Sequence, residues 1–312
     1  MQFPFSLPEN REFDVIGFGT NAVDYLIQVP EYPAFNSKIE LIDYEQAGGG
    51  EVATTMVGLQ RLGLRTSYIG RFGSDDAGGF GFQTLIDEGV DVGYAERIQG
   101  ARTQIAFILI DVRNGERTVI WQRDKKLAYT RAEVPLDAVA QAKVLHLTPH
   151  DTEACLAMAS IADKNGVKVS IDIDRVFDGI DELLPLVDIM IGSSEFPNAF
   201  LGIEDHTLAL KELQTRFGCG IVGVTLGENG SLLLCGDSVI RTPSFAVPNG
   251  CKDTTGAGDS FRVGLLYGLL TGSSVEESAR MANAVAALKC RAIGARTALP
   301  TRAELTDLMK KN

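Results

Sequence analysis

Apolar runs alternate with helix-like stretches along the second half of the chain. The runs are short and bounded by polar or glycine-containing segments, which predicts buried strands. The predicted strands cover 143–147, 167–172, 187–191 and 219–224, and the predicted helices between them cover 151–164, 179–185 and 205–217. Strands and helices that alternate in this way form a parallel sheet with crossover helices, so we expect an α/β core.

The same patterns predict elements nearer both ends of the chain. The expected elements are strands at 13–19 and 66–71, helices at 53–62, 80–88 and 275–290, a hairpin at 231–241 and a helix after Asp259. Two helices are therefore expected to close the chain.

Other strand-like segments do not fit this alternation. They lie at 25–29, 38–43, 103–111 and 117–122. Pro30 and Pro33 interrupt the first pair, and Asn114-Gly115 favours a hairpin turn between the last two. We expect strands within about 23–43 and 103–122 to form a small β-sheet lid on a three-layer α/β/α sandwich with a mostly parallel sheet. Because no repeat or linker is evident, we expect one domain over residues 1–312.

Composition narrows the class of protein. The net charge of -12 argues against a nucleic-acid partner, whose phosphates would be repelled. No apolar run approaches the roughly 20 residues of a membrane span, and the first residues do not resemble a secretory signal. The five cysteines form no CxxC pair, which favours a reducing compartment over disulfides or zinc. We therefore expect a cytoplasmic protein without a membrane partner.

The segment Asp253-Thr-Thr-Gly-Ala-Gly-Asp259 carries the clearest chemistry. Gly256, Ala257 and Gly258 are small and precede or open a helix, whose free amides can bind an anion. A carboxylate at Asp259 could then accept a proton from a hydroxyl that attacks a bound phosphate. The simpler alternative is that Asp259 only caps the helix.

This segment resembles the second signature of the ribokinase (PfkB) family of carbohydrate kinases, and further matches extend over residues 13–300. The resemblance implies a ribokinase-like fold and transfer of the terminal phosphate of ATP to a sugar hydroxyl. It implies that Asp259 is the catalytic base and that Gly256 to Gly258 form an anion hole. It also implies a potassium ion held by Asp253 and Thr255, with Ala292, Gly294 and Ala298 closing its site largely through backbone carbonyls.

The resemblance also suggests substrate-binding residues. Gly48-Gly49-Gly50 and the later 70–76 segment resemble the family's first signature, and Asp24 matches its sugar-binding aspartate. Asp24 could instead be a solvated turn residue just ahead of a lid strand. Thr148 stands where ribose kinases carry a glutamate that contacts sugar.

For the nucleotide, the resemblance points to a loop after the strand at 219–224. Thr225, Gly227 and Gly230 match the family's nucleotide loop, and Asn283 lies where the family often places a residue near adenine. Glu195 matches a glutamate that organises magnesium and phosphate through water. The expected cofactors are thus ATP, Mg²⁺ and K⁺.

Several departures from the family leave the substrate open. Ala53 replaces an asparagine that binds a sugar hydroxyl, and Gly192 replaces the asparagine of the Asn-x-x-Glu motif. The 48–54 and 287–290 segments resemble the sulfofructose-kinase branch. A ketose or pentose is expected, and an anionic sugar, a sugar phosphate or a nucleoside is the alternative. Arg71, Arg102 and Arg123 are candidates to lie near the pocket.

Two other classes of protein compete with a kinase. Gly17-Phe-Gly-Thr-Asn-Ala22 superficially fits a dinucleotide-binding turn, but a strand-like segment follows where that motif requires a helix. A non-catalytic sugar or nucleotide sensor would not need Asp259. We therefore expect a kinase, and the exposed edges of the lid suggest a homodimer formed through it.

Overall fold

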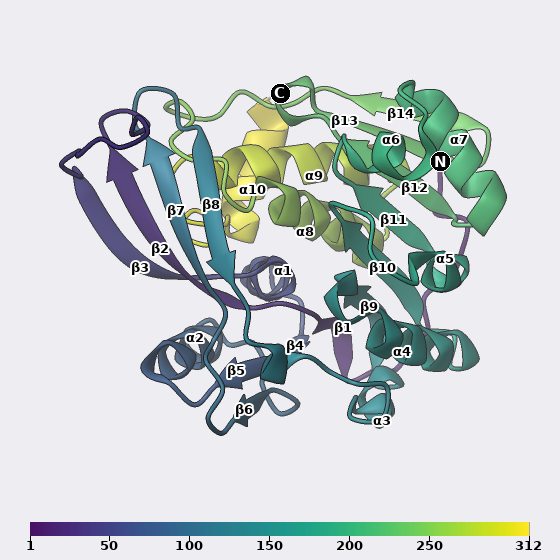
Figure 1. Ribbon diagram of the computed structural model, residues 1–312. Helices are drawn as coiled ribbons and strands as arrows, with labels where there is room; N and C mark the ends of the chain where they lie inside the picture. Colours follow the sequence, from purple (N-terminus) through teal and green to yellow (C-terminus); the bar gives the residue numbers. More distant parts are fainter. Residues whose placement is uncertain (312) are drawn as a thin grey trace.

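The computed structural model describes residues 1–311 and contains an eight-stranded sheet (Figure 1). The strand order is β14-β13-β12-β11-β10-β9-β1-β4, parallel except for the β13 and β14 edge. The strands are β1 (Phe13–Phe18), β4 (Thr66–Ile69), β9 (Ala142–Leu147), β10 (Lys168–Ile173), β11 (Ile189–Gly192), β12 (Ile221–Thr225), β13 (Ser231–Cys235) and β14 (Ser238–Thr242). The predicted, mostly parallel α/β core is confirmed.

Helices cover both faces of this sheet because its strands carry apolar side chains on both faces. In β1, Ile16 and Phe18 belong to the core on one face, and Val15 belongs to the core on the other. The first face is covered by α4 (Thr152–Lys164), α5 (Ile180–Leu183), α6 (Phe196–Leu201) and α7 (His206–Phe217), and the second by α1 (Glu51–Arg61), α8 (Ala257–Leu270), α9 (Val275–Lys289) and α10 (Arg302–Lys311). This is the expected three-layer α/β/α sandwich.

A separate four-stranded sheet stands beside the sandwich and forms the lid (Figure 1). Its order is β3 (Asp43–Gly49), β2 (Ala22–Val29), β7 (Ile105–Asp111) and β8 (Arg117–Gln122). The strand predicted at 38–43 is wrong in position, since β3 starts at Asp43 and includes two glycines that resemble a turn in the sequence. Asp24 lies inside β2, not ahead of it.

The two faces of the lid differ because side chains alternate along each strand. Ala106 and Ile108 of β7 face the sandwich, whereas Phe107 faces away and is 42% exposed. Tyr25 of β2 is paired with Phe107, and the two rings stack with centroids 5.2 Å apart. The outer face of the lid is therefore apolar and exposed.

Several short elements are absent from the predictions. They are β5 (Arg71–Gly73), β6 (Glu96–Ile98), α3 (Leu136–Val139), α6 and α10. The helix predicted at 80–88 is α2 (Asp76–Asp87), which begins one turn earlier than predicted. In α10 only Leu305 is fully buried, so its apolar signal in the sequence is weak. Within residues 1–311, no helix is long and apolar enough to cross a membrane.

Helices α8 and α9 approach each other closely at Gly264. A Cβ atom added there would lie 2.5 Å from the Ala282 Cα and from the Met281 carbonyl oxygen, both of which are backbone atoms. Backbone cannot move aside as a flexible side chain can, so this position requires glycine. The contact also fixes α8, whose first turn lies at the site described below.

We predict that Gly264→Ala lowers stability by about 1–3 kcal/mol, because it overpacks two helices. Gly79→Ala is the matched control, since it is also a helical glycine and its nearest neighbouring atom is the end of Arg97 at 3.7 Å. Alanine should be neutral or stabilising there. Thermal unfolding measures both variants, and equal melting temperatures would contradict the packing argument.

Candidate active site

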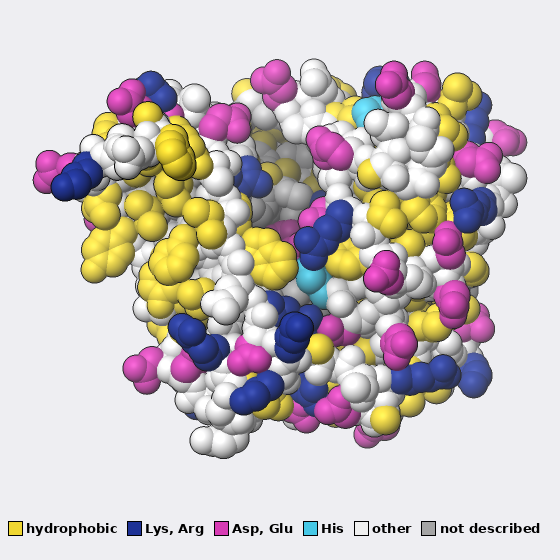
Figure 2. All heavy atoms as spheres, viewed as in Figure 1, with side chains coloured by type: hydrophobic (Ala, Val, Ile, Leu, Met, Phe, Trp, Pro, Cys, Tyr) yellow, Lys and Arg dark blue, Asp and Glu magenta, His cyan; other side chains and the backbone are white. Residues whose placement is uncertain are grey.

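A cavity of about 1000 Å³ lies between the inner face of the lid and the carboxyl ends of the parallel strands. Figure 2 shows the hollow that it makes between the lid and the sandwich. Open α/β sheets bind their ligands at this edge. Residues at or just beyond the ends of β1, β10, β11 and β12 reach it, namely Thr20, Asp172, Ser193 and Thr225.

Helix α8 begins at this cavity, and no side chain among residues 1–311 caps its first turn. The helix follows Gly256, whose φ of 74° lies in the left-handed region. A Cβ atom at Gly256 would also lie 2.9 Å from the Ala295 Cβ, so only glycine fits this turn. The Ala257 amide donates to the Thr254 carbonyl oxygen at 3.1 Å, and the amides that follow it in this uncapped turn are available to an anion. Gly256, Ala257 and Gly258, the residues of the expected anion hole, all line the cavity.

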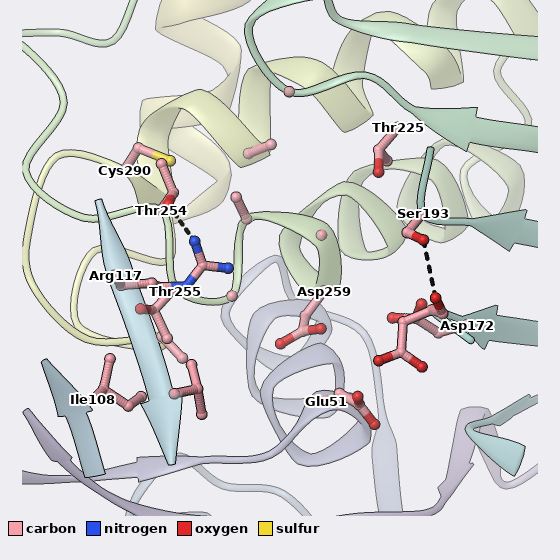
Figure 3. Close-up of a pocket in the computed structure, with 18 of the residues that line it drawn as sticks. Glu51, Ile108, Arg117, Asp172, Ser193, Thr225, Thr254, Thr255, Asp259 and Cys290 are labelled. Atoms are coloured by element: carbon pink, nitrogen blue, oxygen red, sulfur yellow. Dashed lines mark hydrogen bonds between the residues drawn. The ribbon is translucent and has the colours of Figure 1, made fainter. Parts of the chain in front are cut away.

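Asp259 extends from the first turn of α8 into the same cavity, and it does not cap the helix (Figure 3). Burial raises the pKa of its carboxyl group well above the ordinary value, and the negative charges of Asp172 and Glu51 raise it further. The Arg262 guanidinium acts in the opposite direction. A carboxylate with a raised pKa is a better proton acceptor, which suits a general base.

Glu51 and Asp172 are site residues that the sequence analysis missed. Glu51 is the first residue of α1, accepts a hydrogen bond from the Thr20 hydroxyl at 3.1 Å, and has its pKa raised to about 7 by burial. Asp172, near the end of β10, pairs with Arg262 at 2.5 Å. A carboxylate at a helix start or a strand end was the available signal, but it is common and therefore weak.

Asp24 also lines the cavity, and it is only 4% exposed. Burial raises its pKa to about 6, while the nearby Arg296 guanidinium lowers it. A Cβ atom at Gly49 would collide with the Asp24 carboxylate, and one at Gly48 would lie 2.7 Å from an Arg296 nitrogen. These two glycines therefore make room for buried charged groups, and only Gly50 of the three lines the cavity itself.

The predicted nucleotide residues separate into two groups. Thr225, Gly227 and Asn283 line the cavity. Gly230 does not; it is buried in the turn before β13, where a Cβ atom would collide with the Thr242 carbonyl oxygen. Glu195 is exposed at the start of α6, outside the cavity lining, and accepts a hydrogen bond from Ser194 at 2.7 Å.

Thr148 is not brought to the cavity. It is 2% exposed, and its hydroxyl has no hydrogen-bond partner among the described residues. A Cβ atom on Gly19 would collide with this hydroxyl oxygen, so the hydroxyl packs against the backbone just after β1.

The arginines expected near the pocket lie elsewhere. Arg71 pairs with Glu96 and Glu133, and Arg123 pairs with Asp151. Among residues 1–311, the cavity lining does not include Arg71, Arg102 or Arg123. Different arginines line it, namely Arg117 from the lid, Arg175 after β10 and Arg262 in α8.

Behind the anion-binding turn, Asp253 is fully buried at the centre of a hydrogen-bond network. Its Oδ1 accepts bonds from the Thr255 amide at 2.8 Å and the Thr255 hydroxyl at 2.7 Å, and its Oδ2 accepts one from the Gly294 amide at 2.8 Å. Lys289 donates to the Asp253 carbonyl oxygen at 2.8 Å. Ala292 and Ala298 do not line the cavity, and the Ala298 carbonyl accepts a bond from Arg291 at 3.4 Å.

Comparison with known proteins agrees with this geometry. The model of the pfkB family carbohydrate kinases matches residues 16–302. The chain belongs to the PfkB family. Members of this family are phosphotransferases that act on sugar hydroxyls, so the expectation of an enzyme of this class is confirmed. The dinucleotide-binding interpretation of residues 17–22 is correspondingly excluded.

Individual relatives in the PfkB family cover nearly the whole chain. A nucleoside kinase of Methanothermobacter thermautotrophicus is 27% identical over 95% of this chain and 95% of its own length. A ribokinase of Haemophilus influenzae is 28% identical over 94% and 97%. The structure of Arabidopsis thaliana ribokinase complexed with ribose and ATP superposes with a TM-score of 0.82, at 24% identity over 96% and 99%. This last likeness shows the ribokinase fold.

We predict that Glu51→Gln moves the acidic limb of the kcat–pH profile to lower pH. Asp259 must be ionised to accept a proton, so turnover falls as the pH falls through its pKa. The negative charge of Glu51 is one cause of the raised pKa of Asp259. Removing that charge lowers the pKa of Asp259, and the acidic limb therefore moves to lower pH.

A pH–rate series on the mutant and the wild type checks this shift. Glu212→Gln on the exposed side of α7 is the control and should leave the limb in place. An unchanged limb in Glu51→Gln would show that these carboxylates do not titrate together.

Proposed function

We propose that this chain, as a single kinase domain, transfers the γ-phosphate of ATP to a hydroxyl of a small sugar of the ketose or pentose class. One observation carries the proposal. The carboxylate of Asp259 and the uncapped start of α8 open into the same cavity as Asp24. A proton acceptor, an anion-binding turn and a hydroxyl-binding carboxylate are the parts that transfer of a phosphoryl group to a sugar needs.

In the proposed complex, the sugar lies between the inner face of the lid and the strand ends. Asp24 accepts hydrogen bonds from its hydroxyls, and Gly50 gives the backbone room to approach it. Asp259 takes the proton from the attacking hydroxyl. The lid excludes water, which would otherwise compete as acceptor.

ATP lies across the Thr225 and Gly227 turn toward Asn283, with its phosphates at Gly256 to Gly258. Mg²⁺, carried in with ATP, neutralises charge on the phosphates. Magnesium at ATP sites keeps several waters, so an exposed carboxylate can act through them. Glu195 is the matching carboxylate of this chain. It directly precedes α6 and follows the cavity-lining Ser193 by two residues. Potassium is not part of the proposal, because Lys289 faces Asp253.

An anionic sugar is a second candidate, favoured by two arginines on the cavity wall. Arg117 hydrogen-bonds the Thr254 hydroxyl, and Arg175 lies 5.6 Å from the centre of the Trp121 ring. Trp121 also faces the cavity from the lid, so a nucleoside base could stack on it.

We propose that the protein works in a cell compartment that keeps thiols reduced, since its five cysteines are free.

We predict that one sugar on a panel supports ADP release and that Asp259→Asn lowers that turnover by roughly 10² to 10⁴, the range for losing a general base. The panel contains neutral ketoses and pentoses, sugar phosphates, sulfofructose and nucleosides. ATP affinity, measured by calorimetry, should change little. Asp237→Asn in the exposed turn after β13 is the control and should keep full activity.

Full turnover in Asp259→Asn would remove this residue from the role of base. ATP binding without turnover on any panel member would favour the sensor alternative.

We further propose a homodimer in which a second copy covers the outer face of the lid. This face exposes Phe107 on β7, Ile120 on the adjacent β8 and Tyr44 on β3, with Ile120 at 56% and Tyr44 at 64%. Figure 2 shows apolar side chains gathered over the lid. Apolar surface of this kind is stabilised when a second copy covers it.

We predict that Phe107→Glu converts a dimer to a monomer, because it places a charge at the centre of the proposed interface. Light scattering coupled to size exclusion measures the mass. Leu208→Glu, at a residue 60% exposed on α7, is the matched control and should remain dimeric. A monomeric wild-type chain at working concentration would refute the dimer.

A further inference from the structure

Lys289, the last residue of α9, carries a completely buried ammonium group. Its Nζ donates to the Asp253 carbonyl oxygen at 2.8 Å and lies 3.6 Å from Asp253 Oδ2. Burial of a lysine is rare and costly unless the charge is paired. A site that keeps such a charge buried is therefore a candidate for function.

The position of this ion pair connects it to the proposed anion hole. Asp253 lies three residues before Gly256, and its carboxylate holds the Thr255 amide and hydroxyl on one side and the Gly294 amide on the other. The turn that opens α8 is thus fastened to the segment after α9 through Asp253. Lys289 contacts Asp253, the residue that makes this connection, and does not itself line the cavity.

Charge makes the role of Lys289 specific. A buried, unpaired Asp253 would place a negative charge beside a turn that must attract phosphate oxygens, and the two would repel each other. The ammonium cancels that charge, and its bond to the Asp253 carbonyl orients the peptide that leads into the turn. It can do both without touching a substrate, so it is a positioning residue.

The same contacts test the potassium ion that the family resemblance implies. Both carboxylate oxygens of Asp253 accept hydrogen bonds from N–H or O–H donors, its carbonyl oxygen accepts one from Lys289, and the Ala298 carbonyl accepts one from Arg291. An added cation beside Asp253 would meet the ammonium as a like charge. These residues do not fit a potassium ion.

We propose that the Lys289 ammonium is a built-in cation that supports the anion hole, so that this enzyme works without a monovalent metal ion. The proposal rests on the proposed kinase function. It predicts that potassium becomes useful only when the ammonium is removed and space is left for an ion.

The main test compares the wild type with Lys289→Ala and Lys289→Met, in potassium chloride and in choline chloride of equal ionic strength. Wild-type turnover should be the same in both salts. Lys289→Ala should lose roughly tenfold to a hundredfold in choline, the range for removing an outer partner of a charged site. Potassium should restore much of that loss, because the ion can enter the space that the ammonium leaves.

Lys289→Met is the matched control, because it fills the same volume without charge. It should lose activity to a similar extent and gain nothing from potassium. Lys168→Ala, which removes a partly exposed lysine that pairs with Asp188, controls for general salt effects and should behave as wild type.

A second readout needs no sugar substrate and therefore separates this proposal from the kinase proposal. Potassium should raise the melting temperature of Lys289→Ala above its value in sodium or choline, as a ligand that binds the folded state does. The wild type and Lys289→Met should show no such difference. If Lys289→Ala does not fold, the wild type and Lys289→Met still decide the matter.

Two results would overturn the proposal. One is a wild type whose turnover or melting temperature depends on potassium over choline. The other is a Lys289→Met variant that keeps full turnover in choline, since the ammonium would then have no part in the anion hole.

Discussion

No side chain among the described residues caps the first turn of α8, and the proposed site depends on this open helix start to bind an anion. An uncapped helix start in a protein normally binds water or an anion, and here it opens into a cavity. The turn can stay uncapped because other contacts hold it. Gly256 takes the left-handed conformation against Ala295, Asp253 fastens the turn to Gly294, and Gly264 seats the helix on α9.

Acidic groups create the second constraint on this cavity. Asp24, Glu51, Asp172 and Asp259 all line it, and burial raises the pKa of each. Such a cluster would destabilise the fold without cations, and α8 itself supplies one of them, Arg262. Asp259 is left without a direct ion-pair partner among the described residues. A buried carboxylate without an ion-pair partner keeps more of the increase in pKa that burial causes, because no adjacent cation stabilises its charged form.

The sequence predicts the parallel sheet, the helices around it and the start of α8, since each has a local pattern. It cannot predict which distant segments meet in the cavity. Glu51 and Asp172 come together only through the fold. Lys289 resembles an ordinary lysine in the last turn of a helix, where it would favour the helix dipole, so its burial is invisible in the sequence. Thr148 shows the opposite failure: the family resemblance implies a sugar contact at this position, but the side chain is buried against Gly19 and does not line the cavity.

The wall around the proposed sugar site is rich in hydrogen-bond acceptors. The carboxylates of Asp24 and Glu51 line it, whereas Ala53, where the family resemblance implies a sugar-binding asparagine, is buried outside the lining. Carboxylates accept hydrogen bonds from hydroxyl groups and repel anions, which favours a substrate with several free hydroxyls. Of the three arginines on the wall, Arg262 is paired with Asp172, whereas Arg117 bonds only the uncharged Thr254 hydroxyl and Arg175 lies near Trp121. The electrostatics therefore favour a neutral sugar beside Asp24 and Glu51, and Arg117 and Arg175 are the groups that would bind an anionic one.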